Sequence, residues 1–111
     1  HMKIHFVALF MAFALFSGVP AALASDEYTL TIRDHRFIPE TLEIPANRKV
    51  KINIVNEDSS PEEFESYELN REKIIQGNSK GVVFIGPLKP GTYPFFGEFN
   101  MDSAKGQIVA Q

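Results

Sequence analysis

The sequence of 111 residues contains no cysteine and no tryptophan. Without cysteine the chain can form no disulfide bond, has no thiol nucleophile and lacks the lipobox cysteine of a bacterial lipoprotein. A fold of this length then depends on its hydrophobic core alone, which favours one compact domain. The sequence also lacks a glycine-rich phosphate loop and the elbow motif that accompanies a Ser-His-Asp triad. These absences argue against nucleotide-binding and hydrolytic enzymes.

Positive charge is also in short supply. The chain has 11 Lys and Arg against 14 Asp and Glu, a formal net charge of −3. Proteins that bind nucleic acid need a basic surface to neutralise phosphates. We therefore expect no nucleic-acid partner.

The amino-terminal segment reads as a secretory leader. His1 and Met2 are interpreted as a cloning scar and the native start, and Lys3 precedes an apolar run that ends in the small-residue sequence Ala22-Leu23-Ala24. A basic start, a short apolar stretch and a small-residue cleavage site are typical of a signal peptide. We expect residues 1–24 to be the leader and residues 25–111 a periplasmic domain that is soluble once processed. An uncleaved leader is expected to drive association through its apolar surface.

The remaining sequence predicts short strands separated by turns. Apolar and polar residues alternate in several segments, and Pro, Gly, Asn and Asp punctuate them. The expected strands lie around residues 28–32, 41–44, 49–54, 82–85, 92–96 and 107–109. The continuous apolar run at 82–85 predicts a buried strand, whereas residues 61–65 fit either a strand or one helical turn. Seven or eight strands of this size predict an all-β Greek-key sandwich.

An acidic segment at residues 62–68 is the first candidate functional site. On a strand with Phe64 facing the core, Glu63 and Glu65 would share the opposite face, about 7 Å apart at Cα. Two carboxylates on one face can bind a hard or borderline cation. The alternative is a solvated acidic edge that prevents strands of different molecules from pairing.

Two further segments contain possible ligands. His35 has polar neighbours, so it is either an ordinary surface histidine or a metal ligand, since imidazole binds copper, zinc and iron. In the loop at residues 95–102, Glu98, Met101 and Asp102 can donate oxygen or sulfur. The alternative is a hairpin loop whose Met and Phe residues close one end of the fold.

Three segments together resemble a known family. They are residues 34–40 (Asp-His-Arg-Phe-Ile-Pro-Glu), residues 62–73, which begin Glu-Glu-Phe-Glu-Ser-Tyr-Glu, and residues 87–106, which contain Pro-Gly-Thr-Tyr-Pro-Phe-Phe-Gly-Glu-Phe-Asn. They are similar to the cupredoxin-like domains of bacterial periplasmic ferrous-iron uptake systems. The resemblance covers nearly all of residues 25–111.

This resemblance implies a cupredoxin-like sandwich in the periplasm that binds copper, iron or both and assists an iron permease or another iron-uptake component. Carried over by position, His35, Glu63, Glu65 and Glu98 are the candidate ligands, with Met101 as a further one. Any enzymatic activity would be metal-centred oxidation of iron.

The chain also departs from the family. Relatives often have histidine at the position of Asn100, some have it at that of Tyr67, and others have cysteine near Phe37 and in the region of Gly97 and Glu98. A type 1 blue-copper centre needs a cysteine thiolate and two histidines, so this composition excludes it. Two hypotheses remain: a metal-binding accessory of iron uptake, and a metal-free module that docks to a periplasmic or membrane partner.

Overall fold

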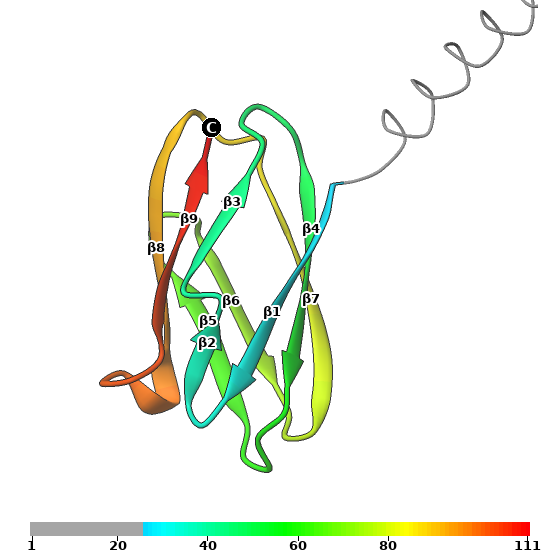
Figure 1. Ribbon diagram of the computed structural model, residues 1–111, viewed down its shortest axis with the longest axis vertical. Helices are drawn as coiled ribbons and strands as arrows, with labels where there is room; N and C mark the ends of the chain where they lie inside the picture. Colours follow the sequence, from blue (N-terminus) through cyan, green and yellow to red (C-terminus); the bar gives the residue numbers. More distant parts are fainter. Residues whose placement is uncertain (1–25) are drawn as a thin grey trace, which may run out of the picture.

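The computed structural model describes residues 26–111, which form two β-sheets packed face to face (Figure 1). This part of the chain contains the strands β1 (Glu27–Arg33), β2 (Arg36–Ile38), β3 (Thr41–Ile44), β4 (Val50–Asn56), β5 (Glu62–Ser66), β6 (Arg71–Ile75), β7 (Ser79–Ile85), β8 (Gly91–Gly97) and β9 (Lys105–Ala110), and the 3-10 turn η1 (Glu98–Asn100). It contains no helix that is both long and apolar enough to span a membrane. The predicted leader, residues 1–24, lies outside the described residues.

The strands are arranged as one sheet of four and one of five. Their orders are β2-β1-β4-β7 and β3-β9-β8-β5-β6. The chain crosses from one sheet to the other between β2 and β3, between β3 and β4, between β4 and β5, and again on either side of β7. This arrangement confirms the predicted all-β Greek-key sandwich.

Alternating side chains explain the orientation of the strands. In β4 the residues at alternate positions are buried, and Ile52 and Ile54 are fully enclosed. β1 pairs with β4 in parallel, with Leu30 opposite Ile54, so the apolar positions of both strands face the same way. A slip by one residue would turn this apolar face to solvent, so burial fixes the register.

Three phenylalanines from both sheets meet in the core. Phe37 of β2, Phe64 of β5 and Phe95 of β8 are fully buried, with ring centroids 4.9 to 6.1 Å apart. The Phe37 ring meets the other two edge-on. Aromatic pairs of this kind contribute about 0.5–1.5 kcal/mol each beyond their buried area. The cluster therefore holds β5 and β8 firmly in place, and both strands lead to candidate metal ligands.

Two local expectations need correction. Residues 62–66 are the strand β5, so the helical turn considered for residues 61–65 is wrong. The expectation of a buried strand at 82–85 is wrong for Val82 and Phe84, which are exposed, whereas Val83 and Ile85 are buried. β7 is the outermost strand of its sheet, and only its inner face is covered by the other sheet.

Candidate metal centre

Strand β5 presents two glutamates on the outer face of the five-stranded sheet. Phe64 points into the core, so Glu63 and Glu65 on either side of it point the other way. Glu65 lies opposite Glu72 of β6 on one side and Phe96 of β8 on the other. Because β5 is an inner strand of the sheet, the interpretation as an acidic edge is wrong.

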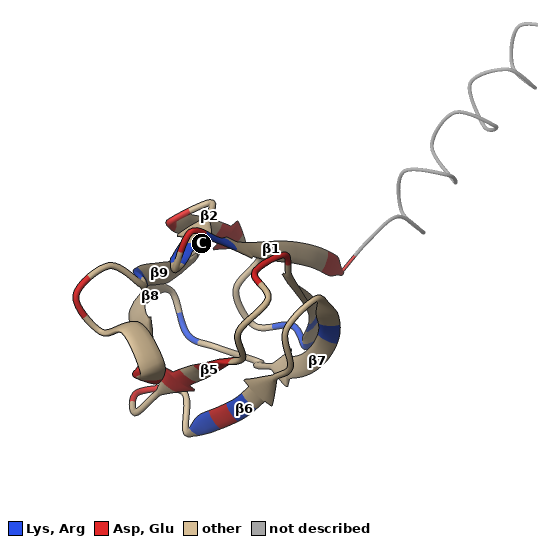
Figure 2. Ribbon diagram, turned by 90° about the horizontal axis from the view of Figure 1, so that it is seen from below, with Lys and Arg blue, Asp and Glu red and all other residues tan. Residues whose placement is uncertain are grey.

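Four carboxylates converge at this face. Glu98 opens η1 directly after β8, and Glu72 reaches the group from β6. Each of Glu63, Glu65, Glu72 and Glu98 can offer one oxygen, and these oxygens all lie within 4.8 Å of one another. Figure 2 shows the acidic residues of β5 from the end of the sandwich near η1. We call these four residues the carboxylate cluster.

The carboxylate cluster is electrostatically strained. Glu63 is only 7% exposed. Its hydrogen bond with Glu98, reinforced by desolvation and by the nearby Glu72, raises the pKa of Glu63 to about 7. Burial, and then the hydrogen bond with Glu72, raises the pKa of Glu65. Carboxylates at this separation can share a proton or bind a cation, but cannot all be charged without cost.

Within residues 26–111, no Lys or Arg forms an ion pair with the carboxylate cluster. The Lys and Arg ion pairs within residues 26–111 are those of Arg33 with Glu57, Arg48 with Asp26 and Lys51 with Glu27. All of them lie elsewhere on the molecule. Solvent reaches the exposed Glu72 and Glu98, whereas a proton or a bound cation can offset the charge of the buried Glu63.

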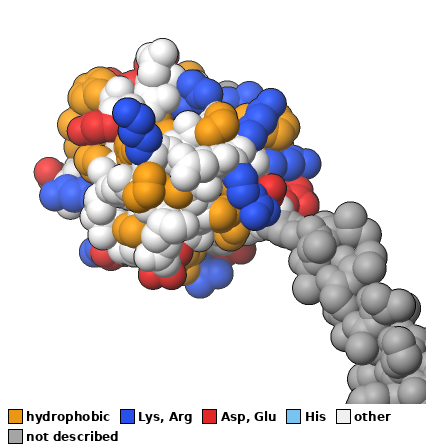
Figure 3. Space-filling view, turned by 90° about the horizontal axis from the view of Figure 1, so that it is seen from above, with side chains coloured by type: hydrophobic (Ala, Val, Ile, Leu, Met, Phe, Trp, Pro, Cys, Tyr) orange, Lys and Arg blue, Asp and Glu red, His pale blue; other side chains and the backbone are white. Residues whose placement is uncertain are grey.

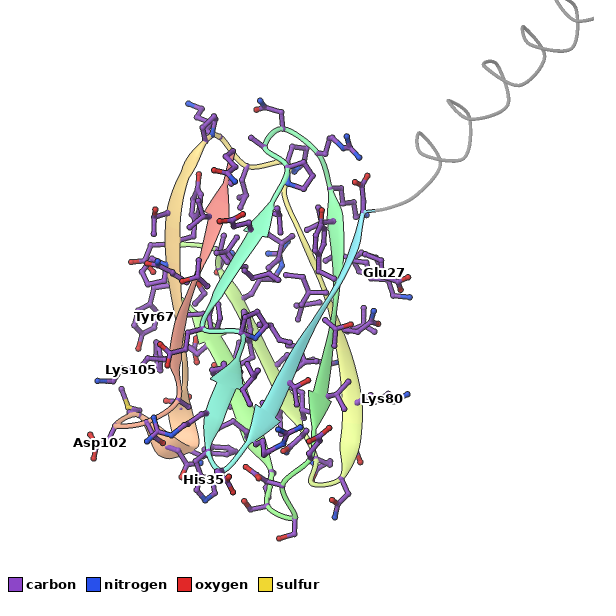
Figure 4. The ribbon with its side chains drawn as sticks, viewed as in Figure 1. Glu27, His35, Tyr67, Lys80, Asp102 and Lys105 are labelled. Carbon is purple, nitrogen blue, oxygen red and sulfur yellow. The ribbon has the colours of Figure 1, made fainter. Side chains whose placement is uncertain are left out.

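The structure places His35 outside the carboxylate cluster. It sits in the turn between β1 and β2, at the end of the sandwich where Asp102 also lies (Figure 4). Its side chain is 49% exposed, and its Nδ1 lies 3.6 Å from Oδ2 of Asp58. Its carbonyl oxygen accepts a hydrogen bond from Ser103 Oγ at 2.6 Å. His35 is thus tied to the loop that follows η1, although its imidazole is paired with a different carboxylate.

Residues 95–102, which were predicted as a loop, comprise the end of β8, η1 and the turn after it, and they divide their side chains between core and solvent. Phe95 is buried and Phe96 is partly buried, whereas Phe99 and Met101 are exposed. Met101 follows η1 directly and is 54% exposed. The side chains of Met101 and Phe99 therefore face solvent. Neither of them closes the end of the core.

Comparison with known proteins agrees with this architecture. Residues 5–110 match the sequence model of the cupredoxin-like domain. The chain belongs to the cupredoxin-like domain family. An uncharacterised protein of Rickettsia prowazekii is 43% identical to it over 83 residues, a match that covers 75% of this chain. The chain spans 66% of the length of that relative, slightly less than two thirds.

Solved cupredoxins share the fold at low sequence identity. Amicyanin from Paracoccus versutus is 14% identical, with a TM-score of 0.61 over 82% of this chain and 87% of amicyanin. An amicyanin variant in its reduced Cu(I) form is 10% identical, with a TM-score of 0.62 over 82% of this chain and 88% of that one. At these identities the likeness shows the fold alone.

The residues of this cupredoxin-like domain do not fit a type 1 copper ion. The sequence has no cysteine, and His35 is the one histidine of the described part of the chain. Tyr67 is exposed, and its ring centroid lies 5.4 Å from that of Phe96. Four oxygen donors fit a hard cation, for which carboxylates are the preferred ligands.

Asn100 binds a buried carboxylate. Its Nδ2 donates a hydrogen bond to Oε2 of Glu62 at 2.7 Å. Glu62 is 1% exposed and points inward from β5. Glu62 was not among the predicted site residues, although strand alternation places it on the same face as Phe64.

Glu72 was also missed, although a signal for it exists. β5 and β6 form a hairpin in which Ser66 pairs with Arg71 and Glu65 with Glu72. Asn70 adopts a left-handed backbone conformation with φ 53°, which is common for asparagine in turns. Placing the turn at residues 67–70 would have set Glu72 opposite Glu65.

Proposed function

We propose that this protein is a periplasmic metal-binding accessory of ferrous-iron uptake. It binds copper or iron at the carboxylate cluster and assists the oxidation of iron or its transfer to a permease. The metal supplies any redox chemistry, and the chain supplies the ligands and the exposed face. The function is not that of a type 1 blue-copper protein, since the residues for that centre are missing.

The observation that carries the proposal is the convergence of four carboxylates without a basic partner. Glu63 is largely removed from solvent, and its acidic neighbours resist its ionisation. A divalent or trivalent cation would replace the shared proton and remove the mutual repulsion. Because the ion-free fold holds the four carboxylates together against their mutual repulsion, relief of this repulsion would favour binding of the ion.

The ligand chemistry favours iron as the substrate ion. Oxygen donors suit hard cations, whereas Cu(I) prefers thioether and thiolate and Cu(II) prefers imidazole. His35 and Met101, the candidates for those softer contacts, are not in the carboxylate cluster. Copper stays in the proposal because Cu(II) binds most tightly among divalent first-row ions to a given set of ligands.

The proposed location in the periplasm and the proposed permease partner rest on the sequence. The leader at residues 1–24 supports export, and the resemblance to ferrous-iron uptake proteins supports a permease as the partner. The cluster lies on an exposed sheet face rather than in a closed cavity, which suits an ion that is passed on to another protein.

Titration calorimetry of the purified chain tests the proposal. We expect saturable one-site binding of Cu(II), and of Fe(II) under anaerobic conditions. The double variant Glu63→Gln with Glu65→Gln should lose this binding while its melting temperature in chelator stays the same or rises, since the substitution removes like-charge repulsion. Unfolding of the double variant would instead make these residues structural.

A matched control is Glu40→Gln with Glu43→Gln, which removes two exposed carboxylates from a different part of the fold. This control should bind as the wild type does. If the wild type binds no ion more tightly than about 1 mM, about −4 kcal/mol, the proposal is wrong. The hydrogen bond between Glu62 and Asn100, which ties down a position that is often histidine in relatives, would then favour the metal-free docking module.

A further inference from the structure

Glu62 and Glu63 are adjacent in β5 but face opposite sides of the sheet. Glu63 belongs to the carboxylate cluster, whereas Glu62 is buried beneath it at the end of the sandwich near η1. A carboxylate that is 1% exposed needs hydrogen-bond donors to offset its desolvation. The segments that supply these donors are therefore the segments that the Glu62 side chain connects.

The donors come from the two segments that carry the cluster. Oε1 of Glu62 accepts hydrogen bonds from the backbone N–H of Glu63 at 3.0 Å and from that of Phe99 at 2.9 Å. Oε2 accepts the one from Asn100 Nδ2 at 2.7 Å. Phe99 directly follows Glu98, so the side chain of Glu62 joins the backbone at Glu63 to the backbone next to Glu98.

The surrounding turn is shaped for this carboxylate. The N–H of Gly97 donates to the carbonyl of Ala104 at 2.8 Å, and the N–H of Ala104 donates to that of Asn100 at 2.8 Å. A Cβ atom on Gly97 would lie 2.6 Å from both Cδ of Glu62 and Cβ of Ala104. Only glycine at position 97 leaves room for Glu62 to reach the turn.

We infer that Glu62 is a positioning residue, which links β5 to η1 through Phe99 and Asn100 and thereby holds Glu98 against Glu63. Glu62 donates no oxygen to the cluster, since its carboxylate lies on the other side of β5. The inference rests on the proposed function, because it explains how that site is held ready for a cation. The hydrogen bonds of the Glu62 side chain thus hold β5 and η1 in place in the absence of a metal ion.

The variant Glu62→Gln tests the inference with Cu(II) as the probe. It removes the negative charge that strengthens all three hydrogen bonds and replaces one of the two acceptor oxygens by an amide N–H, so the link to η1 weakens while the cluster keeps its four carboxylates. We expect Cu(II) affinity to fall about 10- to 100-fold, the range found when residues that orient metal ligands are replaced. The electron paramagnetic resonance spectrum of the bound Cu(II) should then shift toward that of Glu98→Gln, because Glu98 is held less firmly against Glu63.

Two further variants separate positioning from loss of charge or of folding. The double variant Glu62→Gln with Asn100→Asp reverses the direction of the hydrogen bond at unchanged net charge, and should restore affinity and spectrum. Asn100→Ala removes one hydrogen bond only, and should weaken binding less than Glu62→Gln does. If Glu62→Gln fails to fold, these two variants decide the question.

Ser66→Ala is the matched structural control. Ser66 is buried on the same strand and joins β5 to β8 through its bond to the carbonyl of Pro94 at 2.7 Å, but it does not touch η1. Its variant should lower the melting temperature and leave the Cu(II) spectrum unchanged. Wild-type affinity and spectrum in Glu62→Gln would overturn the inference alone. Absence of Cu(II) binding in the wild type would overturn the proposed function together with the inference.

Discussion

At the scale of single residues, the direction of a side chain decides what a glutamate can do in this protein. Glu62, Glu63 and Glu65 are almost contiguous, and a composition or charge profile treats them alike. Because side chains alternate along a strand, Glu62 points inward, where it accepts hydrogen bonds. Glu63 and Glu65 point outward, where they lie beside further carboxylates. Donors stabilise the ionised form of a carboxyl group, whereas acidic neighbours disfavour it.

The outward-facing Glu63 makes the stability of the metal-free protein depend on pH. Its pKa rises from 4.5 to about 7 on folding, so the folded state holds this proton more tightly than the unfolded state. The free energy of unfolding should therefore increase as the pH falls from about 7 to about 4.5. Above this window the group is ionised in both states and its destabilising effect is complete.

Urea denaturation in chelator across this range measures the effect. Glu63→Gln should flatten the pH dependence, and its advantage over the wild type should be largest above pH 7. Glu40→Gln, an exposed carboxyl outside the cluster, should keep the wild-type profile. A wild-type profile in Glu63→Gln would show that this group does not carry the raised pKa.

At the scale of elements, the turn between β1 and β2 depends on one acidic side chain from a distant loop. Asp34 and His35 both have left-handed backbones, with φ 53° and 57°, as in a type I′ hairpin turn. Their N–H groups donate to Asp58 at 2.8 and 2.9 Å. The hydrogen bond from the His35 backbone is the main reason why the pKa of Asp58 is lowered.

Asp58→Asn should therefore destabilise the protein by about 1–3 kcal/mol, the typical contribution of hydrogen bonds to a charged group. Because folding lowers the pKa of Asp58, its stabilisation is present above 3.8 and is lost as the pH falls through the folded-state value. Denaturation at neutral and acidic pH should show the difference between variant and wild type shrinking in acid. Asp102→Asn, in the exposed loop after η1, is the control and should change stability little; an equal loss there would contradict this account.

The elements also show which features the sequence can predict. The alternation of β1, β3 and β4 is local, and so these strands could be located directly. The pairing of Glu63 with Glu65 followed from the same rule once Phe64 was assigned to the core. By contrast, Glu98 joins them only because β8 pairs with β5, a contact between segments some thirty residues apart. The resemblance to a family, not the periodicity, brought Glu98 into the predicted site.

His35, in contrast to Glu98, was predicted as a ligand but lies outside the carboxylate cluster. Its imidazole is the softest nitrogen ligand available, and the family resemblance made it a candidate beside the glutamates. The fold ties its backbone to Asp58 and Ser103 and leaves its ring half-exposed outside the carboxylate cluster. Sequence spacing cannot reveal this, since the position of the ring depends on the turn geometry and on the loop that follows η1. His35 stays a predicted ligand without a place in the cluster.

At the scale of the whole molecule, the carboxylate cluster lies toward one end of the sandwich. The start of β5, η1 and the turn at His35 lie toward this end, and acidic residues of β5 are seen there (Figure 2). The opposite end carries the loops with Arg48, Lys49 and Lys89 and shows both basic and acidic side chains (Figure 3). The described chain begins at this second end, so the segment that precedes Asp26 joins the domain far from the cluster. A cation is attracted to the end that holds the cluster.

Binding at that end should stabilise the entire domain, because the cluster draws on β5, β6 and the end of β8 together. An ion that binds only the folded state adds about 2.7 kcal/mol at a hundredfold excess over its Kd. For a domain of this size that corresponds to a rise in Tm on the order of 10 °C. Thermal unfolding followed by circular dichroism, with and without Fe(II) under anaerobic conditions, measures this shift.

The size of the rise in Tm, compared between variants, tests where the ion binds. The double variant Glu63→Gln with Glu65→Gln should melt at the same temperature with and without the ion, whereas Glu40→Gln with Glu43→Gln should keep the full shift. The rise should also shrink below pH 7, where protons compete with the ion for Glu63. A rise that persists in the Glu63 and Glu65 double variant would place the ion elsewhere on the molecule. His35 and Asp58 would then be the next residues to replace, since they form the other pairing of potential ligands at the same end.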